Sequence, residues 1–287
     1  MQEKKRGRTH SRWLLPAALV LAGAAWFENF TLSTSTVTAA CAALPEAFSG
    51  LRIVQISDLH GRRFDAESRY LLELVRLQSP DLIALTGDLA DEFTDFSMLP
   101  PLLDGLTALA PTFYVTGNHE WVLSREKREA LFSMLDAAGV VRLQNEYRLL
   151  KKGQASIVLA GVDDPNGPYD QKRPAQLVRE IRQSRGRDAY ILMLSHRNDE
   201  LDLWANMGVQ TVLCGHGHGG IVRLPFVGAV FGTHLDLFPD YTAGLYQKGQ
   251  TSMIVSRGLG GSRKLPLRIG NRPEIVTVIL KAESGKV

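Results

Sequence analysis

Cysteine is scarce in this chain of 287 residues, which contains only Cys41 and Cys214. Two cysteines do not make the framework of several disulfides that stabilises small secreted domains. Cys214 ends an apolar stretch and is interpreted as a small buried hydrophobic residue, and Cys41 is interpreted as structural too. With 45% hydrophobic and 22% charged residues, the chain is expected to fold around an ordinary hydrophobic core.

The chain also lacks an excess of charge of either sign once residues 1–12 are left out. The formal net charge is +3, but residues 1–12 hold five basic residues and one acidic residue. The rest of the chain has 28 basic and 29 acidic residues. A body so close to neutral offers no basic surface for a polyanion, so no nucleic-acid partner is expected.

The N-terminal apolar run is short for a membrane-spanning helix. It covers 13–27, which is 15 residues, whereas a spanning helix needs roughly 17–25. A basic segment followed by an apolar run is typical of an export signal, and Ala22-Gly23-Ala24 is an acceptable cleavage site. The alternative is a short transmembrane helix that stays as an anchor, which Trp26 and Phe27 favour because aromatic residues gather at membrane interfaces. Both alternatives place the body outside the cytoplasm, either anchored at the cell membrane or exported.

From residue 51 onward, strand and helix patterns alternate at about 30 residues per unit, which is typical of βαβ crossovers. Pro100 and Pro101 should delay the start of one of these helices or kink it. The segment 29–43 is predicted to be a strand or a linker. Strands are predicted at 51–56, 82–85, 113–116, 190–194, 209–213, 252–255 and 275–280, a hairpin at 141–162, and helices at 68–77, 96–109, 125–137 and 175–184.

We therefore expect an α/β chain with three parts. Residues 1–28 form the basic segment with the anchor or signal, 29–50 connect it to the body, and 51–282 form one catalytic domain. No linker interrupts the last part, so a single domain is the economical prediction.

Residues that can bind metal ions follow five of the predicted strands. Because open α/β sheets place their sites at the carboxyl ends of strands, these residues should lie together. Asp58 and His60, two apart in extended backbone, should point to the same side, as should His216 and His218. The full set is Asp58, His60, Asp88, Asn118, His119, His196, His216 and His218.

The chemistry of this set favours transition metals. Carboxylates, an amide oxygen and several imidazoles suit Mn²⁺, Fe or Zn²⁺ better than Mg²⁺ or Ca²⁺, which prefer oxygen ligands alone. The set is too large for one ion and of the right size for two ions that share a carboxylate. Taken alone, Gly117-Asn118-His119 fits a turn with a solvated histidine equally well.

In their order, these motifs resemble the signature of the calcineurin-like metallophosphoesterases. The motifs are Asp58-Leu59-His60, Gly87-Asp88, Gly117-Asn118-His119-Glu120, His196 and Gly215-His216-Gly217-His218. The resemblance covers about 51–280 and is strongest to the membrane-anchored bacterial branch. It departs at Gly217, where many relatives have threonine, and at Ile221, where glutamine is common.

The resemblance implies a β-sandwich of two sheets flanked by helices, with two divalent metal ions as cofactors. One ion would be held by Asp58, His60, Asp88 and His218. The second would be held by Asp88, Asn118, His196 and His216. The resemblance leaves His119 outside both metal shells, as the catalytic general acid that protonates the leaving group.

Several other residues have two open interpretations. Glu120 either orients His119 or lies at the surface, and Arg197 either contacts phosphate or is solvated. Asp163 and Asp164 are expected to cap a loop. Four basic residues form either an anion-binding rim or a set of solvated side chains: Arg257, Arg263, Lys264 and Arg268. The apolar segment 224–231 either touches lipid or packs on its own domain.

The predicted function is metal-dependent hydrolysis of a phosphate ester, phosphodiester or pyrophosphate at the membrane surface, with lipid-linked phosphate or pyrophosphate among the candidates. A non-catalytic metal-binding scaffold of the same fold is the first alternative, although no ligand-type residue is missing. A secreted nuclease is the second, and the nearly neutral body disfavours it.

Overall fold

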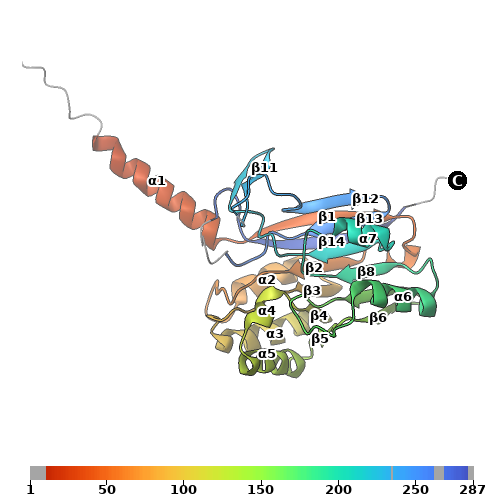
Figure 1. Ribbon diagram of the computed structural model, residues 1–287. Coiled ribbons are helices and arrows are strands. Elements are labelled where there is room, and N and C mark those ends of the chain that lie inside the picture. The colour runs from red at the N-terminus through yellow and green to blue at the C-terminus, as the bar shows by residue number, and fades with distance from the viewer. Residues whose placement is uncertain (1–10, 234, 262–267, 284–287) are drawn as a thin grey trace, which may run out of the picture.

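Two six-stranded sheets pack face to face, with helices on their outer faces (Figure 1). The computed structural model describes residues 11–233, 235–261 and 268–283. In spatial order, the first sheet contains β1 (Ser33–Cys41), β14 (Glu274–Ala282), β2 (Arg52–Ile56), β3 (Leu82–Thr86), β4 (Thr112–Val115) and β5 (Val141–Arg142). The second contains β12 (Gly244–Lys248), β13 (Thr251–Val255), β9 (Thr211–Cys214), β8 (Ile191–Leu194), β7 (Ala155–Gly161) and β6 (Glu146–Lys152).

The helices form two outer layers. The first sheet is covered by α2 (Arg69–Leu77), α3 (Leu99–Leu109) and α5 (Arg125–Ala137), and the second by α6 (Pro174–Arg185) and α7 (Leu201–Asn206). The mixed α/β fold with two main sheets is therefore confirmed. Three further elements lie outside the layers: α1 (Ser11–Phe30) at the N-terminus, the short α4 (Asn118–Val122), and a small hairpin of β10 (Val222–Leu224) and β11 (Gly228–Phe231).

The alternation of side chains along each strand builds three apolar layers. Ile53 points between the two sheets, and its neighbour Val54 points toward the helices of the first sheet. In the second sheet, Leu192 points inward and Met193 points toward α6 and α7. All four side chains are fully buried, because each sheet is covered on both faces.

The parallel strands end on one edge of the sandwich. β2, β3 and β4 run parallel to one another in the first sheet. In the second sheet β7, β8 and β9 do the same. The loops that leave the carboxyl ends of these strands carry the predicted ligands, so the topology gathers them there.

Local structure decides between open alternatives at two places and adds short helices that were not predicted, α4 and α7. A separate 3₁₀ turn covers Phe96–Met98 and α3 begins only at Leu99, with prolines in its first turn, so the prolines delay the helix and do not kink it. The segment at 29–43 is mostly β1, which pairs in parallel with β14. The short helix α4, which the sequence analysis misses, begins at Asn118.

The apolar run at 13–27 lies within α1, a helix of 20 residues that contains Pro16. Among the described residues, no helix is both long and apolar enough to cross a membrane. The predicted transmembrane helix is therefore not supported, and polar residues such as Glu28 and Asn29 shorten the apolar part of α1. The basic residues before position 11, together with Arg263 and Lys264, lie outside the described residues.

Trp204 of α7 offers a test of the outer layer on the second sheet, because its side chain is fully buried. Trp204→Ala should lower the free energy of unfolding by about 3–5 kcal/mol, as removal of a large buried aromatic side chain does. Chemical denaturation measures this change. The matched control is Leu203→Ala, because Leu203 is the exposed neighbour on the same helix; equal losses for both variants would contradict the packing described.

Candidate metal centre

The loops that carry the predicted ligands adopt a left-handed backbone. Asp58 and His60 have φ of +50° and +49°, and His216 and His218 have φ of +67° and +49°. The prediction that each pair lies in extended backbone is therefore wrong, although each pair does face the same site. Left-handed non-glycine residues are uncommon, and they cluster at functional sites where the surrounding structure holds them.

One group of ligand atoms comes from both sheets. Asp58, His60 and His218 place one ligand atom each within 4.8 Å of one another. The two Nε2 atoms of His60 and His218 are 3.3 Å apart, and Nε2 of His218 is 3.7 Å from Oδ1 of Asp58. The backbone N–H of His216 donates to the Asp58 carboxylate at 3.0 Å, which fixes the second-sheet loop against the first.

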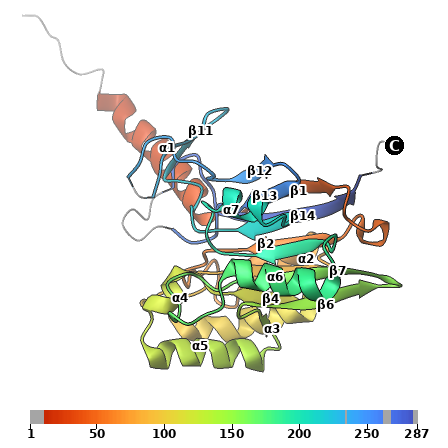
Figure 2. The ribbon, with the colours of Figure 1, turned by 45° about the vertical axis from the view of Figure 1, so that its right-hand side comes forward.

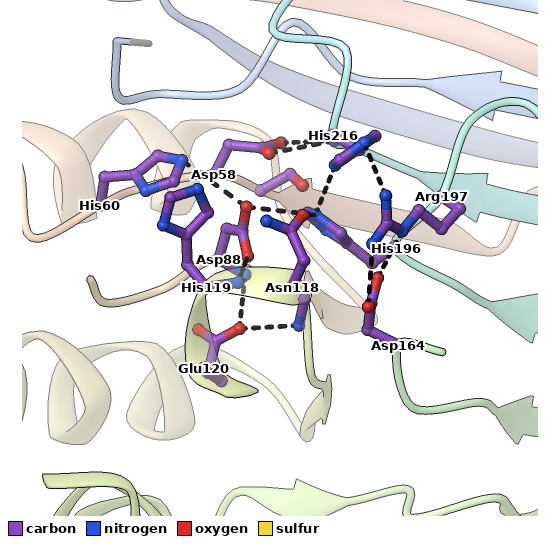
Figure 3. A network of polar contacts seen from close by, with 12 residues as sticks. Asp58, His60, Asp88, Asn118, His119, Glu120, Asp164, His196, Arg197 and His216 are labelled. Atoms are coloured by element: carbon purple, nitrogen blue, oxygen red, sulfur yellow. Dashed lines mark hydrogen bonds and ion pairs between the residues drawn. The ribbon is translucent and has the colours of Figure 1, made fainter. Parts of the chain in front are cut away.

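A second group forms around Asp88 (Figure 3). Nε2 of His196 lies 3.2 Å from Oδ2 of Asp88 and 3.1 Å from Oδ1 of Asn118. Nδ1 of His216 is 3.2 Å from the same Nε2 of His196. The other ring nitrogen of His196 donates to the backbone oxygen of Thr86 at 2.8 Å, so Nε2 is directed into the site.

His119 lies beside His60 and Asp88. It is half-buried and its ring packs edge-on against His60, with 4.6 Å between the ring centroids. His119 also forms a third possible metal group with His60 and Asp88. Asp88 and His60 thus belong to two groups each, and the structure brings together all eight predicted site residues.

Glu120 is neither a surface residue nor a partner of the His119 ring. Its carboxylate is fully buried and accepts backbone N–H donors from both ligand loops. The donors are Asp88 at 3.0 Å, Leu89 at 2.7 Å, Ala90 at 3.3 Å and Gly117 at 2.7 Å. Glu120 therefore holds the loop after β3 against the turn that begins α4, a role that only the folded backbone reveals.

Two glycines let these loops approach each other closely. A Cβ at Gly117 would lie 2.2 Å from Oδ1 of Asp88, and one at Gly215 would lie 2.3 Å from Oδ2 of Asp58. Neither gap leaves space for a side chain. The glycines of the Gly-Asn-His and Gly-His-Gly-His motifs are thus required by the packing around the two carboxylates.

Burial and charge shift the pKa values in opposite directions within the site. Burial raises the pKa of Asp58 to about 6 and lowers that of His60 to about 4. Burial would also raise the pKa of Asp88, but the neighbouring His196 holds it well below the ordinary value. For His196, burial opposes protonation while the Asp88 carboxylate favours it and raises the pKa to about 10.

These residues fit a site for two cations. His60 and His218 both have pKa values lowered by burial, which leaves neutral imidazoles that can bind metal. The Nδ1 atoms of both rings are buried and have no hydrogen-bond partner among the described residues. Carboxylates and imidazoles that converge in this way are the donor set of a transition-metal site, and Asp88 belongs to two of the three ligand groups.

Arg197 is held in place and is not freely solvated. Its guanidinium makes a two-point contact with Asp164, at 2.6 Å from Nε to Oδ2 and 3.0 Å from Nη2 to Oδ1. Its Nη1 lies 3.1 Å from Nε2 of His216. Asp164 also caps its own loop by accepting from the N–H of Asn166, as expected. A cavity of about 220 Å³ opens beside these residues.

Neither interpretation of the basic residues, an anion-binding rim or solvated side chains, fits the two that the structure describes. Arg268 is buried and donates to backbone oxygens, including that of His218 at 3.4 Å. Arg257 forms an ion pair with Glu274, with Nε 3.0 Å from Oε2. Both arginines therefore connect loops around the site and are not available as a surface for anions.

This fold and this donor set define a metal-dependent phosphoesterase, and comparison with known proteins agrees. Residues 51–220 match the family model of the calcineurin-like phosphoesterases, and the chain belongs to this family. It is a phosphoester hydrolase whose residues are arranged for a dimetal site.

Two bacterial relatives match most of the chain. The uncharacterized metallophosphoesterase YkuE of Bacillus subtilis is 31% identical over 90% of this chain and 89% of its own length. Phosphodiesterase YaeI of Escherichia coli is 31% identical over 80% of this chain and 82% of its own length. A zebrafish "transmembrane protein with metallophosphoesterase domain" is 26% identical over 83% of this chain and 55% of its own length.

The contacts of Glu120 predict the effect of a nearly isosteric change. Glu120→Gln replaces an acceptor oxygen with an amide that points donors at backbone N–H groups. The free energy of unfolding should fall by about 2–4 kcal/mol, because buried donors lose their partners. Chemical denaturation and metal analysis of the same preparation measure stability and site integrity.

Glu129→Gln is the matched control, since Glu129 lies exposed on α5 in an ion pair with Arg125. It should change neither quantity. If Glu120→Gln were as stable as the control and retained its metal, the carboxylate would not be holding the two ligand loops together.

Proposed function

We propose that this chain is a two-metal phosphohydrolase that acts outside the cytoplasm at a membrane surface. Its substrates would be phosphate esters, phosphodiesters or pyrophosphates, lipid-linked ones among them. The observation that carries the proposal is the position of Asp88, which belongs to two groups of ligand atoms that extend to either side of it (Figure 3).

The side chains divide into two shells around that carboxylate. Asp58, His60 and His218, whose ligand atoms lie within 4.8 Å of one another, would form one shell, and Nε2 of His60 lies 3.7 Å from Oδ2 of Asp88. The other consists of His196 and His216 together with the amide oxygen of Asn118, which lies 3.1 Å from Nε2 of His196. The mixture of imidazole and oxygen donors supports Mn²⁺, Fe or Zn²⁺ as the ions.

When bound, two such ions supply positive charge for the phosphate oxygens and make hydroxide available near neutral pH. The chain's own residues supply position and protons. Glu120 and the close glycines fix the carboxylates, and the Thr86 carbonyl fixes the ring of His196. His119 reaches the site through its half-buried ring beside His60 and is the residue we assign as general acid.

The membrane location is supported by the sequence that precedes the sandwich. Basic residues are followed by the apolar helix α1, the order found in exported and membrane-attached proteins. The relatives from zebrafish and cattle are named as transmembrane proteins with a metallophosphoesterase domain. No observation favours the nuclease alternative, because the body carries no excess of basic residues.

Metal analysis tests the two-shell arrangement directly. The purified chain, loaded with Mn²⁺ or Zn²⁺, should hold about two ions, as a two-metal site requires. Asp88→Asn should lose both ions or nearly all activity because it weakens both shells. The control Asp136→Asn alters an exposed carboxylate paired with Arg142 and should bind like the wild type. A stoichiometry of zero or one in the loaded wild type would contradict the proposal.

The leaving group tests the assignment of His119. An alkoxide needs a proton to depart, whereas a nitrophenolate departs unaided. His119→Ala should therefore lose about 10²–10⁴-fold in rate on alkyl esters and much less on nitrophenyl esters, provided that chemistry limits the rate. Its two metal ions should remain.

His218→Ala is the comparison variant, because it should weaken metal binding and impair both substrate types alike. Loss of metal from His119→Ala would instead identify His119 as a ligand, as its group with His60 and Asp88 permits. Equal rate losses on both leaving groups, with metal retained, would exclude it as the general acid.

A further inference from the structure

The large exposed apolar side chains of this protein are concentrated on two elements. Of the 20 found among the described residues, six lie on α1 and six on the β10–β11 hairpin and the loop that follows it. We call these twelve residues the apolar surface: Leu15, Leu19, Val20, Trp26, Phe27, Phe30, Leu224, Phe226, Val227, Leu235, Leu237 and Phe238. Exposed apolar clusters of this kind mark interaction sites, whereas single exposed residues do not.

Both elements lie on one side of the molecule. α1 and β11 extend from the same side of the sandwich in both views, away from α5 (Figures 1 and 2). Hydrogen bonds connect them through one short segment. Asn29 of α1 exchanges hydrogen bonds with the backbone of Arg268, and the next residue, Ile269, exchanges them with Ile221 and Arg223 at β10.

The last turn of α1 is fixed to the domain by arginines. The guanidinium of Arg62 lies 5.4 Å from the ring centroid of Phe30, and that of Arg272 lies 4.4 Å from that of Phe27. The described side chains of α1 before this turn are exposed. The helix is therefore held at its base, and its apolar length stays exposed among the residues that the structure describes.

The chemistry of the apolar surface fits lipid. Apolar residues surround α1 instead of forming one stripe, so a protein groove would cover only part of it. At its base, aromatic rings lie beside arginines, the arrangement that suits the boundary between lipid tails and headgroups. Four basic residues, Lys4, Lys5, Arg6 and Arg8, precede α1 in the sequence and would favour anionic headgroups.

The apolar surface is joined to the metal centre. β10 begins four residues after His218, whose backbone oxygen accepts from Asn271 at 2.9 Å and from Arg268 at 3.4 Å. The same Arg268 binds α1 through its backbone. A lipid layer that touches the hairpin would therefore lie close to the loop that carries the predicted ligand His218.

A groove of about 580 Å³ lies beside the hairpin, and its lining includes the charged Arg223 and Asp240 as well as aromatic side chains. It is lined by Phe226, Phe238, Tyr241 and Tyr246, among others. The backbone oxygen of Tyr241 accepts from Asn198 at 2.8 Å, and Asn198 follows the ligand His196 by two residues. This hydrogen bond connects one lining residue of the groove to the loop that carries His196.

We propose that the apolar surface docks on a lipid bilayer and that the substrate is a phosphoester carried by a lipid of that layer. The second part rests on the phosphohydrolase function proposed above. Phe226 at the hairpin tip is fully exposed and would enter the layer together with α1. The hairpin would then hold the metal centre at the level of the headgroups.

An environment-sensitive probe tests the docking in the full-length chain. Phe226→Cys carries an NBD label, and the two native cysteines are buried and should not react. On vesicles of phosphatidylcholine and phosphatidylglycerol at a ratio of about 3:1, the NBD emission should shift to the blue and rise severalfold, because the probe leaves water. The control Ser133→Cys places the label on exposed α5, on the opposite side, and should show no shift.

Substrate presentation is tested with Phe226→Asp and the control Ser133→Asp. Hydrolysis of soluble bis(4-nitrophenyl) phosphate should stay within about twofold of wild type for both variants. Hydrolysis of dioleoyl phosphatidic acid in the same vesicles should fall at least about 10-fold for Phe226→Asp alone. Transfer of a phenyl ring from water into the bilayer raises the partition coefficient by at least about that factor, and Phe226→Asp removes this contribution.

The outcomes separate the two proposals. The docking would be overturned if the NBD emission at position 226 did not shift on vesicle-bound protein. It would also be overturned if the emission did not shift and the mass of the protein in solution were doubled, because a second copy of the chain would then be the partner. Cleavage of the soluble ester without cleavage of the vesicle lipid, or equal rates for Phe226→Asp and wild type on that lipid, would overturn lipid presentation and leave the phosphohydrolase intact. Failure on both substrates with metal bound would refute the phosphohydrolase itself.

Discussion

The structure depends on two buried carboxylates, Asp58 and Asp88, that the fold holds within a cluster of imidazoles. Burial penalises the charge on both, yet histidines favour ionisation of Asp88, and backbone N–H groups donate to both carboxylates. Such an arrangement is costly without a cation and becomes favourable with one. The dense packing around the cluster, with glycines where no Cβ fits, follows from the need to keep these ligands in place.

That requirement explains where the backbone is strained. Five of the predicted ligands have positive φ, and none of them is glycine: Asp58, His60, Asp88, His216 and His218. Each left-handed residue costs free energy, and the surrounding contacts must supply it. Glu120 is the clearest of these supports, because one buried carboxylate binds four backbone N–H groups from two loops. In this protein, the residues that could bind metal are thus also the ones whose backbone conformation must be stabilised by the surrounding structure.

The edge that carries the metal centre also meets the exposed apolar elements. Arg268 lies at this junction, buried, with its side chain on the carbonyl of His218 and its backbone on Asn29. The N-terminal helix is thus tied to the same loops as the ligands, not to a remote part of the sandwich. A lipid partner would cover the exposed apolar residues and bring a phosphoester headgroup close to the metal centre. Membrane binding and hydrolysis would then depend on the same loops.

The sequence by itself determined the alternation of strands and helices through apolar periodicity, and its motifs indicated the eight residues that the structure brings together, because both are local signals. The two-sheet class followed from the family resemblance that those motifs carry. The sequence misjudged the backbone at Asp58 and His60, which is left-handed and not extended, because their N–H groups donate to the backbone oxygens of Gly87 and Asp88 in a loop about 30 residues away in the chain. Only the tertiary structure decided that Glu120 joins two loops, that Arg197 binds Asp164, and that Arg268 is buried. Those partners lie up to dozens of residues away in the chain, so no local pattern encodes them.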